Sequence, residues 1–306
     1  MRGKPFSTQL LRDSKRHYQL YMLAVPMILF YLIFVYTPMY GIIIAFKDFS
    51  IVKGIAASPW VGFENFRNVF ENIFFKRAFF NTLFISFGKV LLGFPVPIIL
   101  ALLLNEVRIR WFKGLFQNVM IIPYFLSWVV FAGILENLFN ASGLINGILA
   151  VRDSEPIAFL ADTNWFLGIV FVSDIIKGAG WETIIYLAAL SSIDPQLYEA
   201  AEVDGANRWK QTKHITLPGI ASTIVILLIL RVGYLMYAGF EQIFALYSPI
   251  VYERADILDT FVYRLGIEQG NYSFAAAAGL FQGLIGLVLL FSVNWITKRM
   301  GSSGLF

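Results

Sequence analysis

The sequence predicts an all-α polytopic membrane protein with six transmembrane helices. Of its 306 residues, 58% are hydrophobic and 14% are charged, whereas soluble domains carry about 25% charged residues. The mean hydropathy is +0.68. Six apolar runs each reach the roughly 20 residues that a helix needs to cross a bilayer core. No linker or low-complexity stretch separates these runs, so we expect a single transmembrane domain over residues 1–306.

The six predicted spans cover residues 19–46, 79–105, 116–138, 165–191, 219–247 and 274–297. We expect the first span to stay as an anchor after a basic leader at residues 1–18, because it is longer than a signal-peptide core and lacks a small-residue cleavage site. Pro95 and Pro97 predict a kink in the second span. Residues 58–70 mix aromatic and charged side chains, which is typical of an amphipathic interfacial segment or of a capping loop.

Basic residues predict the direction of the spans. The leader, the tail and the loops at 106–115 and 192–218 hold 13 Lys and Arg residues and a net charge of +7, whereas the other three loops hold 8 and a net charge of −2. Cytoplasmic loops of membrane proteins are enriched in Lys and Arg. We therefore expect both termini and the 192–218 loop to be cytoplasmic.

The composition disfavours an enzyme. The chain has no cysteine and only two histidines, His17 and His214, which lie far apart in the sequence. We therefore expect no metal site, disulfide, thiol nucleophile or histidine-based catalytic triad. The stretch at 86–89 (SFGK) lacks the upstream glycine of a phosphate-binding loop, and no nucleotide motif occurs elsewhere. Any ATP and Mg would have to bind a partner, and no cofactor is expected in this chain.

The 192–218 loop is the most polar stretch between two apolar runs. Asp194 can cap a helix that starts at Pro195, and a glycine turn at Gly205 precedes a second short helix at 207–215. Leu197 lies with two alanines on one apolar stripe of the first helix. This pattern is consistent with a solvated hairpin or with a helix that docks in a groove of another protein.

The same loop carries a long motif with fixed spacing. Its pattern is E-A-A, three residues, Gly, nine residues and I-x-L-P, and it is matched by Glu199, Ala200, Ala201, Gly205, Ile215, Leu217 and Pro218. The motif resembles the signature of ABC-importer permeases. Together with six spans and VGFENF at 61–66, it makes the chain similar to the carbohydrate-uptake branch, which includes the maltose-type and LplB-like permeases.

The resemblance implies a type I importer permease fold in a prokaryotic cell membrane. It implies four kinds of partner: a second homologous permease subunit, two cytoplasmic ATPase subunits, an extracellular solute-binding protein and a carbohydrate substrate. In that family the loop docks in a cleft of the ATPase, so Glu199 would make a polar contact and Gly205 a tight turn. Closure of the ATPases on ATP would then switch the permeases from inward-facing to outward-facing.

Ionisable residues within the predicted spans are costly and need a reason. At helical spacing, one face of the fourth span carries Asp174, Lys177, Gly178, Trp181 and Glu182. One face of the fifth span carries Arg231, Tyr234, Ala238 and Glu241 in the same way. The second span holds Lys89. These residues could neutralise one another, with Lys177 pairing to Asp174 and Glu182. We favour a substrate pathway, because aromatic and charged groups together suit the apolar faces and hydroxyl rims of sugars.

Three cations in this set extend the hypothesis to an acidic oligosaccharide. Lys89, Lys177 and Arg231 could each form a charge-assisted hydrogen bond with a uronate, although the carboxylates nearby cancel their charge formally. The sequence thus predicts a permease subunit of an ATP-driven carbohydrate importer. The alternative is an ion-coupled secondary transporter that uses Asp174 and Glu182 as cation sites, works without an ATPase and leaves the loop motif unexplained.

Overall fold

The computed structural model describes residues 17–151 and 154–299, so nearly all of the basic leader predicted at 1–18 lies outside the described residues. The described part consists of helices and loops, and its β-type pairing is one isolated bridge between Lys47 and Trp60. The all-α prediction is therefore confirmed.

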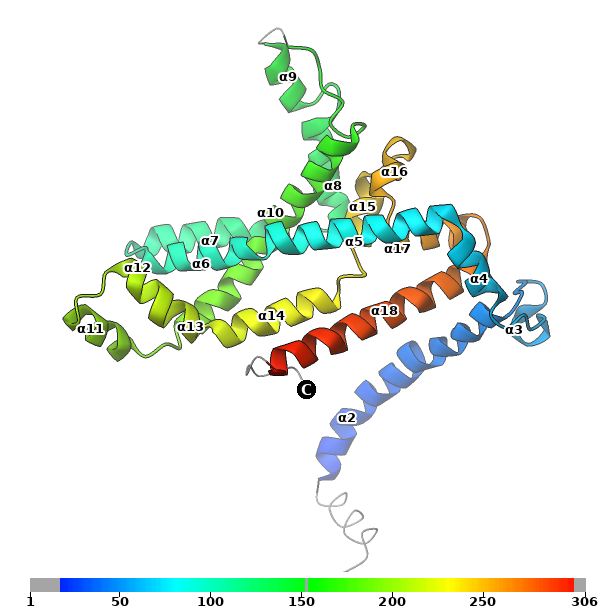
Figure 1. Cartoon of the computed structure of the whole chain (residues 1–306), viewed down its shortest axis with the longest axis horizontal. Helices are drawn as coiled ribbons and strands as arrows, with labels where there is room; N and C mark the ends of the chain where they lie inside the picture. Colours follow the sequence, from blue (N-terminus) through cyan, green and yellow to red (C-terminus); the bar gives the residue numbers. More distant parts are fainter. Residues whose placement is uncertain (1–16, 152–153, 300–306) are drawn as a thin grey trace, which may run out of the picture.

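The N-terminal helical run extends away from the rest of the molecule (Figure 1). It consists of α2 (Tyr18–Tyr31), η1 (Leu32–Tyr36) and η2 (Thr37–Phe46). Its only buried residue is Ala45, near the end that contacts the bundle. Two short helices follow, α3 (Gly54–Ala57) and α4 (Glu64–Glu71). The amphipathic helix α4 overlaps the 58–70 segment, with Val69 buried and an exposed Arg67–Glu71 ion pair.

The bundle is organised around one long helix, α10 (Thr163–Leu190). Asp162 caps it by accepting hydrogen bonds from the backbone N–H groups of the next turn, at 2.9 and 3.0 Å. It packs against α5 (Ile73–Gly93), α6 (Pro95–Glu106) and α7 (Arg110–Phe125). The last helix, α18 (Tyr272–Arg299), packs against η2 and against α14 (Ala221–Gly233).

Shorter helices extend from the bundle in several directions (Figure 1). On one side are α8 (Trp128–Phe139) and α9 (Leu144–Ala150). After α14 come α15 (Phe240–Leu246), η4 (Pro249–Val251), α16 (Tyr252–Ala255), α17 (Leu258–Tyr263) and η5 (Arg264–Glu268). At the end of α10 lie α11 (Pro195–Val203), α12 (Arg208–Gln211), η3 (Thr212–Thr216) and α13 (Leu217–Gly219).

The count of six continuous spans is not reproduced. Within residues 17–151 and 154–299, four helical runs are long and apolar enough to cross a membrane, or five if a pair bent by 59° counts as one span. The four are Tyr18–Phe46, Ile73–Glu106, Trp128–Ala150 and Tyr272–Arg299, and the pair is Arg208–Gly219 with Ala221–Gly233. The fourth predicted span is one continuous helix, α10, which is not among the four runs.

Two predicted spans are broken. The run predicted at 116–138 is divided between α7 and α8. Pro123 lies in the last turn of α7. The Ser127 side chain then starts α8 by accepting a hydrogen bond from Val130 N–H at 3.2 Å. The run predicted at 219–247 is divided between α14 and α15 by a loop at 234–239 that ends at Gly239. In the second span, α5 ends at Gly93 and α6 begins at Pro95, and the two helices together count as one continuous span.

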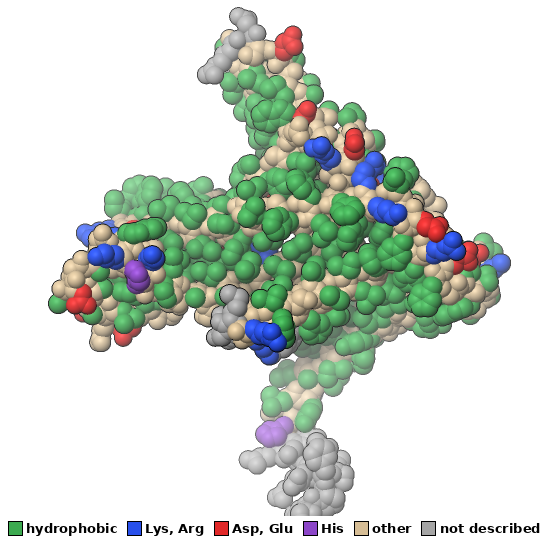
Figure 2. Space-filling view, in the orientation of Figure 1, with side chains coloured by type: hydrophobic (Ala, Val, Ile, Leu, Met, Phe, Trp, Pro, Cys, Tyr) green, Lys and Arg blue, Asp and Glu red, His purple; other side chains and the backbone are tan. Residues whose placement is uncertain are grey.

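The surface has an apolar zone between charged zones. Hydrophobic side chains cover most of the visible face, whereas charged side chains gather around α11 and α12 and along the edge from α16 to α4 (Figure 2). A bilayer favours this distribution, because charged groups at its centre cost several kcal/mol or more. Along α18, no atom of the described chain lies within 4 Å of a Cβ built at Gly279 or Gly283, whereas Gly286 lies next to the Gly233 carbonyl of α14.

Candidate functional site: a hairpin and a buried charge cluster

The segment from α11 to α13 folds into a helical hairpin at one end of the molecule (Figure 1). Asp194 caps α11 by accepting a hydrogen bond from Gln196 N–H at 3.0 Å, as predicted. After α11 the chain turns at Gly205, whose φ is +74° and whose N–H donates to the Glu202 carbonyl at 3.0 Å. Side chains with a Cβ disfavour this conformation. The predicted glycine turn at Gly205 is therefore confirmed.

Side-chain contacts tie the two arms of the hairpin together. The hydroxyls of Tyr198 and Thr216 lie 3.1 Å apart, which joins α11 to η3. The buried Gln211 side chain donates to the Ala206 carbonyl at 3.2 Å inside the turn. An exposed ion pair of 3.5 Å between Arg208 and Glu106 links α12 to the end of α6. The hairpin is therefore braced internally and attached to the bundle at both ends.

The motif residues differ in exposure. On α11, Glu199 and Ala200 are exposed, and Ala201 is half-buried. Beyond the turn, Ile215 and Leu217 are half-buried, and Pro218 is exposed. The chain bends by 59° after Gly219, so the hairpin meets α14 at an angle. Helix α11 thus exposes a face with both polar and apolar side chains, which the rest of the chain does not cover.

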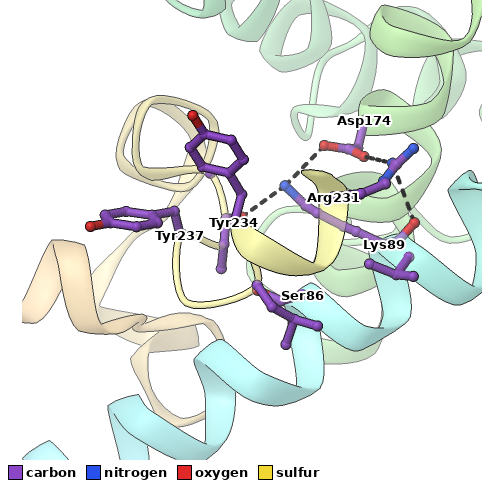
Figure 3. Close-up of a pocket in the computed structure, with 10 residues that line it drawn as sticks. Ser86, Lys89, Asp174, Arg231, Tyr234 and Tyr237 are labelled. Carbon is purple, nitrogen blue, oxygen red and sulfur yellow. Dashed lines mark hydrogen bonds and ion pairs between the residues drawn. The ribbon is translucent and has the colours of Figure 1, made fainter. Parts of the chain in front are cut away.

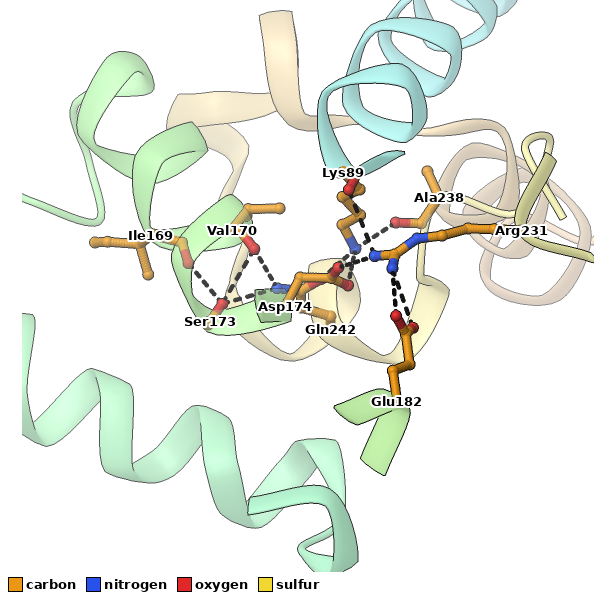
Figure 4. A network of polar contacts seen from close by, with 9 residues as sticks. All are labelled: Lys89, Ile169, Val170, Ser173, Asp174, Glu182, Arg231, Ala238 and Gln242. Atoms are coloured by element: carbon orange, nitrogen blue, oxygen red, sulfur yellow. Dashed lines mark hydrogen bonds and ion pairs between the residues drawn. The ribbon is translucent and has the colours of Figure 1, made fainter. Parts of the chain in front are cut away.

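A second feature is a cluster of four charged side chains at the centre of the bundle (Figure 4). Lys89 from α5 lies 3.1 Å from Asp174 of α10. Asp174 also lies 3.3 Å from Arg231 of α14, which contacts both oxygens of Glu182 at 3.0 and 3.1 Å. Two cations and two carboxylates therefore form a chain of ion pairs with no formal net charge.

Neutral partners complete the coordination of Lys89. Its ammonium donates to the Ala238 carbonyl at 2.8 Å and to the side-chain oxygen of Gln242. The Gln242 amide in turn donates to the Val170 carbonyl and to the Ser173 hydroxyl, both at 2.8 Å. Buried charges are tolerated when ion pairs and hydrogen bonds replace water. The loop between α14 and α15 is thus held against α5 and α10.

The cluster borders two hollows. One, of about 150 Å³, is lined by Lys89, Asp174 and Arg231 together with Tyr234 (Figure 3). The other, of about 290 Å³, shares Asp174 and Arg231 with the first and also borders Glu182. Both hollows combine cations, carboxylates and aromatic rings, which is a chemical mixture suited to a polar, ring-shaped ligand.

Most of the predicted pathway residues meet here. The larger hollow is lined by Asp174, Lys177, Gly178, Glu182 and Arg231, with the rings of Tyr124 and Trp128. Trp181 stacks on Tyr124, with ring centroids 4.9 Å apart and planes 7° from parallel.

Two predictions about these residues are wrong. Lys177 forms no ion pair with Asp174 or Glu182. Its ammonium instead donates to the carbonyls of Pro123, Tyr124 and Leu126 at the end of α7. These carbonyls are available because the end of a helix leaves carbonyls without helical partners. The residues from Arg231 to Glu241 do not share a helical face, because the loop at 234–239 interrupts the helix. Glu241 lies in a separate hollow with Trp128 and Glu136.

Several site residues were not predicted from the sequence. Gln242 and Ser173 were available as polar residues within predicted spans, but only the fold shows that they support Lys89. Tyr124 and Trp128 had no signal that separates them from the many aromatic residues of an apolar chain. Gly239 lies at φ +94°, and a glycine in a predicted span can signal such a break.

This chain has an apolar surface, and its helices surround a cluster of charged side chains. That combination is typical of membrane transport proteins. Residues 93–302 match the family described as "Binding-protein-dependent transport system inner membrane component". The chain therefore belongs to this family, whose members are the multi-pass permease components of ABC importers.

Individual relatives cover almost the whole chain. Protein LplB of Bacillus subtilis (strain 168) is 44% identical over 95% of this chain and 92% of its own length. The polygalacturonan/rhamnogalacturonan transport system permease protein YteP of the same organism is 43% identical over 94% and 90%, respectively. A bacterial ABC transporter involved in the import of the acidic polysaccharide alginate has a TM-score of 0.89 at 41% identity, covering 95% of this chain and 99% of the other.

Proposed function

We propose that this chain is the permease subunit of an ATP-driven importer for an acidic oligosaccharide. The observation that carries the proposal is a pair of cations, the buried Lys89 and the half-buried Arg231. They border hollows that also contain aromatic rings. A uronate carboxylate that enters from either hollow can replace Asp174 or Glu182 as the partner of Arg231. The names of YteP and of the alginate transporter support an acidic cargo.

The rest of the machinery follows from the family. A solute-binding protein would deliver the cargo, a second permease would complete the pathway, and two ATPases would bind ATP and Mg. The exposed arm α11, with Glu199 at its surface, would dock on one ATPase, and its connection to α14 would transmit movement toward Arg231. We expect the hairpin and both termini to be cytoplasmic. Binding-protein dependence favours this function over ion-coupled secondary transport, which requires no such delivery.

Uptake by the complete complex in proteoliposomes tests the cargo. The two sugars are an oligogalacturonide and its methyl ester, which has the same shape without the charge. In the double variant Arg231→Gln/Glu182→Gln, one cation and one carboxylate are removed together, so no buried charge loses its only partner. We expect import of the free acid to fall about tenfold or more, since a hydrogen bond to a charged group contributes about 1.5–3 kcal/mol.

Import of the ester should change little in the same variant. The matched control is Arg67→Gln/Glu71→Gln, which removes the exposed ion pair of α4 and should affect neither sugar. An equal loss for acid and ester would contradict a role of Arg231 in charge recognition. Uptake by this chain without ATP and an ATPase would contradict the importer assignment and favour the ion-coupled alternative.

A further inference from the structure

A further hollow lies next to the charge cluster and has different chemistry. It is a groove of about 660 Å³ between α17, η5 and α18, within the range of roughly 300–1,000 Å³ typical of small-molecule sites. Tyr237 and Gly239 line both this groove and the smaller hollow at Lys89, so the two are adjacent. Tyr237 is half exposed and points away from Lys89 and Asp174 (Figure 3).

The groove has aromatic walls and a polar floor without a cation. Four rings line it, those of Tyr237, Phe240, Tyr263 and Tyr272. The polar groups are Asp259 of α17 and the buried Gln282 of α18, whose amide donates to Asp259 Oδ1 at 2.8 Å. The same amide donates to the Met236 carbonyl at 2.8 Å, so Gln282 fixes the groove to the loop at 234–239.

Charge separates this groove from the central cluster. The donor to Asp259 is a neutral amide, which does not cancel the negative charge of a carboxylate. A uronate unit in the groove would therefore be repelled, whereas the hydroxyls of a neutral sugar can donate to Asp259 and its C–H face can stack on the tyrosines. At the cluster, by contrast, two cations balance the two carboxylates, and Arg231 can exchange one of these carboxylates for that of a uronate.

We infer that the groove is a second sugar subsite, selective for a neutral pyranose unit adjacent to the acidic unit held at the charge cluster. The inference rests on the proposed function and deepens it. The cargo would then be an oligosaccharide that combines neutral and acidic sugars. The groove is lined by α17 and the first half of α18. These segments lie on the same side of the molecule as α16 and α4, away from α11 (Figure 1), so the neutral unit would lie on the far side of the cluster from the hairpin.

Gly279 offers a way to fill the groove without disturbing its walls. It lines the groove, and a Cβ at this position meets no atom within 4 Å. Gly283 lies one turn further along α18, is equally free of neighbours and does not line the groove. Gly279→Leu therefore places a side chain in the proposed subsite, and Gly283→Leu is a matched control with the same change on the same helix.

The test compares two disaccharides as cargo of the complete complex in proteoliposomes: one of rhamnose and galacturonate, and one of two galacturonates. The same binding protein serves every variant, so the ratio of variant to wild-type uptake isolates the permease. With Gly279→Leu, we expect import of the mixed disaccharide to fall at least tenfold and import of the diacid to stay within twofold. With Asp259→Asn, import of the diacid should rise several-fold. Gly283→Leu should change neither.

Other outcomes overturn the inference. An equal loss for both sugars with Gly279→Leu, or failure of the second permease to copurify with that variant, would mean that the groove serves assembly or movement. Unchanged import with Gly279→Leu and Asp259→Asn would mean that no sugar occupies it. In those cases the wild-type complex still imports acidic sugar, whereas failure of the proposed function would show as no wild-type import of either disaccharide.

Discussion

At Gly239 the backbone takes a φ of +94°, and a Cβ built on it would lie 2.7 Å from the Lys89 ammonium. This position therefore needs glycine for two reasons, the left-handed conformation and the close approach of a cation. Lys89 is 9% exposed and relies on the carbonyl of Ala238, the residue before Gly239. The charge cluster thus depends on a residue that has no charge of its own.

Replacing Gly239 with alanine should destabilise the protein. A non-glycine residue in a sparsely populated region of φ and ψ costs about 1–3 kcal/mol, and displacement of Lys89 from its carbonyl partner adds to this cost. We expect a lower melting temperature of the purified complex for Gly239→Ala. Gly147→Ala in α9, where a Cβ meets no atom within 4 Å, should leave it unchanged or slightly higher. Equal melting temperatures for both variants would contradict this account of Gly239.

At the scale of elements, the sequence predicts the regular helices well and the breaks poorly. The prediction for α10 differs from the structure by a residue or two, because a strong cap at Asp162 and a long apolar run agree with each other. Hydropathy continues across 126–127 and 234–239, however, so it does not separate α7 from α8 or α14 from α15. Those breaks follow from local features that hydropathy does not register: Pro123 with the Ser127 cap, and the Gly239 conformation.

The hairpin is the element with the most direct mechanical prediction. Gly205→Pro removes a backbone donor and demands a φ near −65° in place of +74°, and Glu199→Lys reverses the charge of the exposed arm. Both should allow the ATPases to hydrolyse ATP at or below the basal rate but reduce uptake at least tenfold. ATPase and uptake assays on the same proteoliposomes measure the two activities separately.

Glu253→Lys is the control for the change of charge, because Glu253 is an exposed carboxylate on α16, far from the hairpin. It should leave both activities as in the wild type. Normal uptake in complexes that carry Gly205→Pro or Glu199→Lys would mean that α11 does not transmit the movement of the ATPases.

At the scale of the whole molecule, the cluster joins α5, α10, α14 and the loop before α15, which are far apart in the sequence. Helical spacing predicts which residues share a face of one helix, and it correctly grouped Asp174 with Glu182. It cannot predict which helices lie side by side, so the Lys89–Asp174 and Arg231–Glu182 pairs emerged only from the fold.

Helix α2 has no buried residue. Its apolar side chains therefore indicate a surface that lipid or the second permease covers.

The absence of cysteine from the chain makes its orientation directly measurable. Val203→Cys at the end of α11 and Val52→Cys before α3 place thiols at positions that are 88% and 96% exposed. We expect a membrane-impermeant thiol reagent to label Val52→Cys in intact cells and Val203→Cys only in inside-out vesicles. The reverse pattern would place the hairpin outside the cell, where no ATPase could bind it.

The central claim, that the charge cluster lies on the substrate pathway, is tested most directly by thiol labelling at Tyr234 in the assembled complex. Tyr234 lines the hollow at Lys89 and Arg231 and is 68% exposed. Leu91 on α5 is the control, because it is 60% exposed but lines none of the hollows described above. We predict that labelling of Tyr234→Cys by a charged thiol reagent depends on ATP and is slowed by acidic oligosaccharide, while labelling of Leu91→Cys is indifferent to both. Labelling of Tyr234→Cys that is the same in every state, with or without sugar, would contradict the account.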